Sequence, residues 1–242
     1  MAKQSQLTRP PLREALVDLQ IVEELPLQWA EGLAGRRLPG FEAPKPIRQG
    51  RFSLQMEADR PAKASAADEL LGWRFDSADG ARVAQLRRNG ATHNVLRGYT
   101  SWGEIRAGAQ EVWRRYCEWT NRIVVSRLAV RYINVIEIPL GADFDEYLEA
   151  GPRVPQPLPP KVSHFVCRLE IPFSPETKVI VTQALEPPRQ NWLPVILDID
   201  VQYECKLRGD SPDVWSRLDE LRPIKNAVFF SSLTERALEP YR

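Results

Sequence analysis

The sequence predicts an α+β fold made of two similar halves, each an antiparallel sheet covered by helices. Runs of apolar residues alternate with polar ones at the period of a strand, and short turns join many of them. Each series of strands is followed by a helical stretch. Strands that follow one another through short turns favour antiparallel pairing, and the repeated plan raises the possibility of an internal duplication.

The predicted halves meet at a proline-rich connection. We place the N-terminal half at residues 1–140, the connection at 141–161 and the C-terminal half at 162–242. The chain has 242 residues, of which 43% are hydrophobic, so it is long enough to bury a substantial core. Its 21 prolines cluster between the predicted elements and mark their ends.

The strongest strand signal is Ile123–Pro139, which we expect at the centre of the N-terminal half. The stretch is rich in β-branched residues and free of glycine, and Pro139 ends it. Its second half is apolar on both faces, which predicts cover on both sides.

The elements before this strand follow from local patterns. Period-two alternation predicts the strands, Asn89-Gly90 predicts a hairpin, and Ser101 with Glu104 forms a capping box that starts a helix ahead of the central strand. The predicted strands are 14–21, 51–57, 70–76, 82–88 and 92–96, with a short helix at 26–33 and a polar connection at 58–68.

The C-terminal half repeats the plan. Its predicted strands are 164–171, 178–185 and 193–207, preceded by a short acidic helix at 143–150. Ser211-Pro212 predicts a helix start, because serine caps well and proline suits the first position. Pro223 is expected to break that helix, so that 224–238 forms a second one.

Composition narrows the class of protein. A net charge of +1 gives no sign of a nucleic-acid or anionic-membrane partner. The three cysteines, Cys117, Cys167 and Cys205, form no CxxC pair, which favours a reducing compartment. The first residues carry no apolar segment of a signal peptide, and no apolar run is long enough for a transmembrane helix. We therefore expect a cytoplasmic protein.

An acidic strand is one candidate site. Asp198, Asp200, Gln202 and Glu204 share one strand face, and aligned carboxylates could bind a hard cation such as Mg²⁺. The alternative is the ordinary polar face of an antiparallel strand, which we favour because no second acidic cluster or phosphate loop accompanies it. We therefore expect no metal site and no cofactor, with Mg²⁺ at Asp198, Asp200 and Glu204 as the alternative.

Basic and aromatic residues supply the other candidates. Arg127 and Arg131 share a face of the central strand and could bind a phosphate or carboxylate, or could pair with neighbouring acids. Trp102 and Trp192 lie near element starts, where aromatic side chains can line a pocket or an interface. With Asn134 of the central strand, these four form the candidate binding set for a ligand or partner.

Motifs of common enzymes are missing from the sequence. It has no GxGxxG or Walker A pattern and no zinc-ligand spacing, and its two histidines accompany no nucleophile elbow. The sequence thus favours a protein without catalytic activity and leaves the question of an enzyme open.

Five separated segments carry a resemblance that spans almost the whole chain. They are Pro10–Ala15, Tyr99 with Trp102, Arg127–Pro139, Leu197–Asp200 and Lys225–Phe230. In this order they resemble a sporadically distributed, functionally uncharacterised family of bacterial proteins of similar length. The resemblance implies no catalytic residues. Patchy distribution fits mobile or defence-linked gene neighbourhoods.

Three functional hypotheses follow. The leading one is a non-catalytic binding protein that interacts with another protein subunit, such as an accessory subunit of a multi-protein bacterial system for phage defence. The second is a metal-assisted phosphohydrolase or nuclease-like enzyme that uses Asp198, Asp200 and Glu204, with Arg127 and Arg131 on the phosphate. The third is a sensor that binds a small ligand between the two halves.

Overall fold

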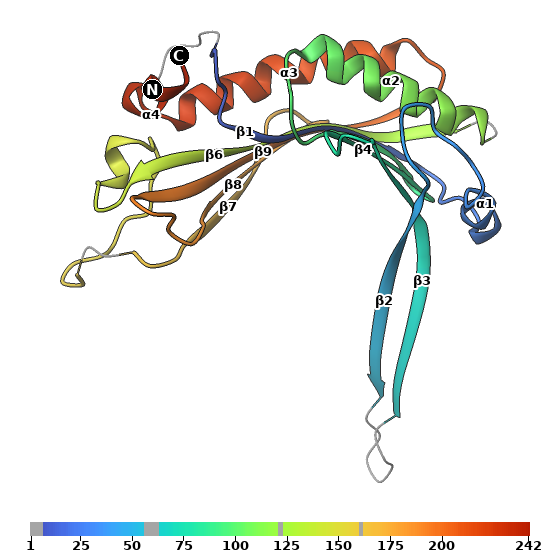
Figure 1. Ribbon diagram of the computed structural model, residues 1–242, viewed down its shortest axis with the longest axis horizontal. Helices are drawn as coiled ribbons and strands as arrows, with labels where there is room; N and C mark the ends of the chain where they lie inside the picture. The colour runs from blue at the N-terminus through green and yellow to red at the C-terminus, as the bar shows by residue number, and fades with distance from the viewer. Residues whose placement is uncertain (1–6, 56–62, 121–122, 160–161) are drawn as a thin grey trace.

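A single antiparallel sheet organises the molecule. The computed structural model describes residues 7–55, 63–120, 123–159 and 162–242. Nine strands form one sheet in the order β2-β3-β4-β5-β1-β6-β9-β8-β7 (Figure 1). The strands are β1 Leu12–Ile21, β2 Lys45–Gln55, β3 Lys63–Asp76, β4 Arg82–Arg87, β5 Gly90–Val95, β6 Val124–Pro139, β7 Val166–Pro172, β8 Thr177–Leu185 and β9 Trp192–Arg208. The helices are α1 Leu27–Gly32, α2 Trp102–Glu118, α3 Asp213–Ser232 and α4 Glu235–Leu238, with 3₁₀ turns at Phe144–Glu146 and Glu239–Tyr241.

The prediction of an α+β fold with two sheet-containing halves is wrong. β6 pairs with β1 along one edge and with β9 along the other, so strands from both predicted halves belong to the same sheet. A long central strand needs a hydrogen-bonded neighbour on each edge, and β9 supplies the second one. The fold is mostly β, with helices on part of the sheet, and the proposed duplication loses its basis.

Two long helices cover one face of the sheet. α2 packs on β5 and β1, and α3 packs on β6 and β9, so both lie on the same side (Figure 1). β6 turns Leu128, Val130, Ile136 and Ile138 toward them, all fully buried. Ser101 Oγ accepts a hydrogen bond from the Glu104 amide at 3.3 Å, which confirms the predicted cap of α2. None of the helices in the described ranges is long and apolar enough to cross a membrane.

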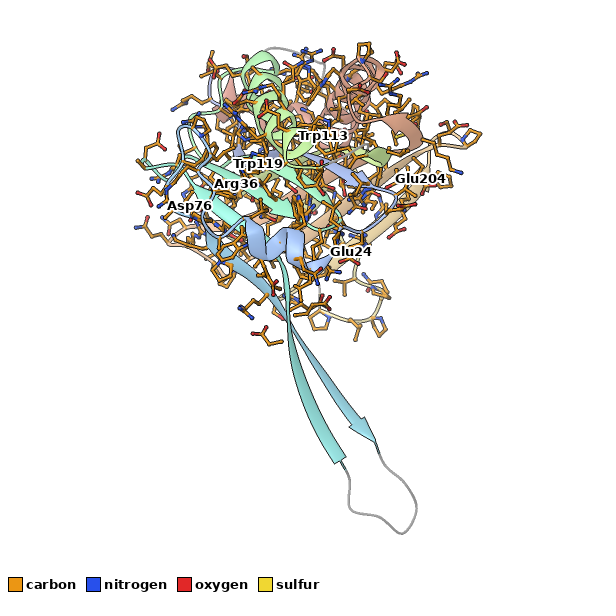
Figure 2. All side chains as sticks on the ribbon, turned by 90° about the vertical axis from the view of Figure 1, so that its right-hand side faces the viewer. Glu24, Arg36, Asp76, Trp113, Trp119 and Glu204 are labelled. Carbon is orange, nitrogen blue, oxygen red and sulfur yellow. The ribbon has the colours of Figure 1, made fainter. Side chains whose placement is uncertain are left out.

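Aromatic side chains attach α1 to the end of this covered face. Trp73 Nε1 donates to the Ala30 carbonyl at 2.6 Å, and Trp29 Nε1 donates to the Trp119 carbonyl at 2.8 Å. The Arg36 guanidinium lies 5.4 Å from the centroid of the Trp119 ring, and Figure 2 shows the two side chains close together. Trp113 is buried in the core beneath α2.

Most predicted elements are present, and a few differ in type or extent. α3 runs through Pro223, because one lost backbone hydrogen bond is outweighed by the buried contacts of Leu218, Leu221, Phe229 and Phe230. The predicted helix at 143–150 is only one 3₁₀ turn. β2 starts earlier than predicted, and β3 already begins at Lys63 inside the predicted connection. Residues 56–62, which hold the end of that predicted strand and the start of the connection, lie outside the described residues.

The second face of the sheet carries no helix of the described chain. The sheet curves around this face, and the β2–β3 hairpin projects from its rim away from the body (Figures 1 and 2). Alternate residues of β1, β6 and β9 point to it, including Asp18, Arg127, Arg131 and Asp200. We call this second face, to which these four side chains point, the open face.

Candidate functional site

The largest cavity that we describe lies between α3 and the covered face of the sheet. Its volume is about 950 Å³. It is lined by Leu7, Thr8, Pro10, Leu12, Tyr99, Thr100, Ser101, Trp102, Tyr132, Asn134, Arg222, Lys225, Asn226, Phe229 and Phe230. We call it the α3 pocket. A cavity of this size suits a small organic ligand, for which pockets of roughly 300 to 1,000 Å³ are usual.

Regular spacing brings the polar lining residues together. Tyr132 and Asn134 are two residues apart on β6 and therefore point to the same, helix-covered face. Lys225 and Asn226 lie three and four residues after Arg222, and Phe229 lies four and three residues after them, so one face of α3 presents them all. The cap of α2 at Ser101 holds the segment with Tyr99 against this space.

Lys225 is the chemically unusual residue of the α3 pocket. Its Nζ lies 3.9 Å from the centroid of the Tyr132 ring, a cation–π contact. Burial, with a smaller contribution from the positive charge of Arg222, lowers the pKa of Lys225 to about 7. Lys225 is thus close to half protonated at neutral pH and would gain its full charge beside an anion.

The two cations of the α3 pocket have no acidic partner in the described part of the chain. No carboxylate there lies within ion-pair distance of Lys225 or Arg222. Asp219, one turn earlier on α3, instead accepts from Trp102 Nε1 at 2.7 Å and lies 3.1 Å from Arg106 Nε. Positive charge that faces a cavity without a counter-ion favours an anionic ligand.

The wall opposite α3 is aromatic and hydrogen-bonded. The hydroxyl groups of Tyr99 and Tyr132 are 3.0 Å apart, and their rings meet edge to face at 5.6 Å. Burial raises the pKa of Tyr132, so its hydroxyl stays protonated and can donate. Asn134 is fixed by donating to the Leu197 carbonyl at 3.1 Å. Together with Phe229 and Phe230, this wall suits a ligand that joins an acid group to an apolar body.

The open face holds the second group of candidate residues. Its cavity of about 370 Å³ is lined by Glu14, Leu16, Asp18, Gln20, Gln85, Arg87, Thr92, Asn94, Arg127, Ala129, Arg131, Ile133 and Asp200. Arg87 donates to Asp18 at 2.5 Å and Arg127 donates to it at 2.8 Å. Thr92 Oγ1 also donates to Asp18 at 2.5 Å. Burial alone would raise the pKa of Asp18, but these partners hold it below its usual value.

The acidic strand is engaged in a similar way. Arg131 donates from Nε and Nη2 to the two oxygens of Asp198 at 2.9 and 2.6 Å. Asp200 accepts from Gln202 at 2.6 Å, its Oδ1 is buried without a partner among the described residues, and burial raises its pKa. This is the predicted alternative in which arginines pair with acids of the sheet, although Asp18 was not foreseen as a partner.

The sequence-predicted residues therefore separate into four places. Asn134 and Trp102 line the α3 pocket, whereas Arg127, Arg131 and Asp200 line the open face, with Asp198 bound to Arg131. Glu204 (labelled in Figure 2) pairs in register with Arg127 but is exposed, and it borders a separate surface hollow beside Glu176. Trp192 begins β9 with 41% of its surface exposed and lines neither cavity.

No catalytic or binding motif in the sequence pointed to the main lining residues of the α3 pocket. Lys225, Arg222 and Tyr99 belong to no recognised catalytic or ligand-binding motif, and a lysine on a helix is ordinarily a solvated charge. The signal that did exist was the resemblance. Four of its five segments, at 10–15, 99–102, 127–139 and 225–230, contribute residues to this one cavity.

Comparisons with protein-family models, curated proteins and solved structures find no match to this chain.

Proposed function

We propose that this chain is a binding protein that takes a small organic anion, a carboxylate or a phosphate on an apolar body, in the α3 pocket. The observation that carries the proposal is the pair Lys225 and Arg222, which line a cavity of about 950 Å³ without an acidic partner in the described ranges. The hydroxyl of Tyr132 and the side chain of Asn226 add polar contacts, and Phe229 and Phe230 add apolar ones.

Calorimetric titration with three probes tests the proposal. The probes are adenosine monophosphate, benzoate and inorganic phosphate, which separate the acid group from the apolar body. We expect one of the two organic probes to bind the wild-type protein, and Lys225→Met to weaken that binding by roughly 10- to 100-fold, because a charge-assisted hydrogen bond is lost. Lys225→Met keeps the length of the side chain over Tyr132, so packing changes little.

Lys206→Met is the matched control, because Lys206 is exposed on β9 and lies outside the α3 pocket. It makes the same chemical change and is expected to bind the probe as the wild type does. Binding of neither organic probe, or equal affinity in Lys225→Met and wild type, would argue against the proposal.

The hypothesis of a protein partner does not depend on the α3 pocket alone. A binding protein with a ligand pocket can act as an accessory subunit of a multi-protein bacterial system, and phage defence stays a prediction of that kind. An affinity pull-down from the native host, repeated after nuclease treatment, tests it. A stoichiometric protein that survives the nuclease would support the hypothesis, and recovery of the chain alone would oppose it.

The metal-enzyme hypothesis has less support from the geometry. Both oxygens of Asp198 are bound by Arg131, and within the described residues no group of three or more His, Cys, Asp or Glu side chains could hold a metal ion. Titration of Mg²⁺ and Mn²⁺ into the wild type and Asp200→Asn tests it. Metal binding that disappears in the variant would revive the hypothesis.

A further inference from the structure

The outer edge of β7 is unusually apolar for a free sheet edge. β7 ends the sheet, and Figure 1 shows no described element beyond it. Every residue of the strand is exposed, including Val166 at 62%, Leu169 at 49% and Ile171 at 44%, and Phe173 follows at 60%. Exposed edge strands with apolar side chains are surfaces on which another strand can pair.

The hydrogen-bond pattern shows which residues of β7 can pair outward. The Phe165 carbonyl accepts from Leu185 N at 3.1 Å, and Phe173 N donates to the Thr177 carbonyl at 2.8 Å. In an antiparallel ladder such residues alternate along the strand, so odd-numbered residues of β7 bond to β8. The backbone groups of Val166, Arg168 and Glu170 therefore point away from the sheet.

The charges of β7 match those of a second β7 running in the opposite direction. Arg168 and Glu170 lie on the same face of the strand, with their side chains paired at 2.9 Å and half exposed. If two copies meet around a two-fold axis at Leu169, Arg168 of each copy lies opposite Glu170 of the other. Both are outward-bonding positions, so this register also provides backbone hydrogen bonds.

We propose that two copies of this chain pair through β7 in antiparallel orientation, centred on Leu169, and join their sheets into one continuous sheet. A shift by two residues in either direction would place Arg168 opposite Arg168 or Glu170 opposite Glu170, which like-charge repulsion disfavours. In the proposed register Leu169 faces Leu169 and Cys167 faces Ile171, so the exposed apolar side chains cover one another on the side of the sheet that carries α2 and α3.

Charge reversal tests the pairing and its register together. We expect a dimer in sedimentation equilibrium over roughly a hundredfold range of concentration. Arg168→Glu and Glu170→Arg should each weaken it by about tenfold or more, since two attractive pairs become repulsive. The double variant Arg168→Glu with Glu170→Arg should restore it, because the opposite charges again face each other.

Arg208→Glu is the matched control. It makes the same change in net charge at a side chain that is 80% exposed near the end of β9, past the region level with β7. It is expected to leave the dimer intact. A monomer at all concentrations, or single reversals that dimerise as the wild type does, would overturn the proposal.

Disulfide trapping gives an independent measure of the register. In a Cys167→Ser background, Leu169→Cys places the new thiol opposite its own copy, and oxidation should yield a covalent dimer on a non-reducing gel. Val166→Cys in the same background lies opposite Pro172 and should yield little. Equal cross-linking of the two variants, or cross-linking of Val166→Cys alone, would contradict the register.

Discussion

At the scale of single residues, Lys225 is the side chain on which the proposed anion site depends. A lysine normally keeps its charge in water, and here it lies over the Tyr132 ring beside Arg222 with its pKa lowered to about 7. This arrangement lowers the free energy of unfolding unless a bound anion compensates the positive charge. Such unfavourable placement of a charge is typical of functional sites, where stability is given up for binding.

The pKa of Lys225 predicts how stability depends on pH. The group binds a proton more weakly in the folded protein than in the unfolded chain, whose lysine pKa is about 10.5. The destabilisation is therefore complete below pH 7 and is relieved as pH rises toward about 10.5. Denaturant unfolding should show wild-type stability rising over this range relative to Lys225→Met. Parallel curves for the two proteins would contradict the lowered pKa.

His93 gives the corresponding prediction on the acid side. It is buried, and burial lowers its pKa to about 4 from its ordinary value of 6.5. The unfolded chain takes up a proton first, so stability should fall between pH 6.5 and about 4, by on the order of 3 kcal/mol. Unfolding of His93→Gln should lack this component. An unchanged slope in the variant would show that burial does not lower the pKa of His93 in the folded protein.

Gly108 explains how α2 approaches His93. A Cβ on Gly108 would lie 2.3 Å from His93 Nε2, so Gly108→Ala should destabilise the protein by about 1 to 3 kcal/mol through overpacking. Gly103→Ala on the same helix meets nothing closer than 3.7 Å and should be neutral or slightly stabilising. Thermal unfolding of both variants measures the contrast. Equal effects would mean that α2 sits farther from the sheet.

At the scale of elements, local signals in the sequence predicted most helices and strands correctly. They did not predict which strands pair across the chain. The Ser101 cap of α2, the Asn89-Gly90 hairpin and the alternation of β6 depend on neighbours in sequence, and all three are present. The pairing of β6 with β9 joins residues about 70 positions apart, and nothing local specifies it. Because no local pattern indicates this contact, the sequence predicts two halves where the structure has one sheet.

The same limit applies to the candidate site. Alternation placed Arg127 and Arg131 together on one face of β6, and the structure shows both on the open face. It could not show that Asp18 of β1 lies between Arg87 and Arg127, because that depends on strand order. The α3 pocket combines the N-terminal segment, the start of α2, β6 and α3, and no periodicity in one element reveals such a combination.

Pro223 gives a prediction for α3 itself. The proline leaves the Asp219 carbonyl without its usual amide donor inside a helix that runs on to Ser232. Pro223→Ala restores the donor and should stabilise the protein by roughly 1 kcal/mol, less than the full helix penalty because proline also restricts the unfolded chain. Chemical denaturation tests this. A loss of stability would show that the packing of α3 requires the proline.

At the scale of the whole molecule, one sheet separates two environments. The covered face carries the apolar core and the α3 pocket, and the open face carries charges that largely neutralise one another. Acids on the open face bind arginines from neighbouring strands, as Asp18 does with Arg87 and Arg127. The open face therefore connects β4, β1 and β6, and unpaired positive charge is found on the side of α3.

Asp18 tests this division of roles. Asp18→Asn removes the partner of two arginines at a buried position and should cost about 3 to 5 kcal/mol in the free energy of unfolding, as for broken buried ion pairs. Asp210→Asn, which alters an exposed pair with Arg208, should leave the free energy of unfolding almost unchanged. A small effect of Asp18→Asn would mean that the open face contributes little to stability.

The most direct test of the ligand site is the titration of Lys225 itself. Nuclear magnetic resonance can follow the ε-methylene signals of Lys225 with pH, with and without adenosine monophosphate or benzoate, and the exposed Lys206 serves as reference in the same spectra. We expect one of these anions to raise the pKa of Lys225 well above about 7 and to leave the chemical shifts of Lys206 the same as without it at each pH. A pKa of Lys225 that neither anion alters would contradict the assignment of the α3 pocket as an anion-binding site.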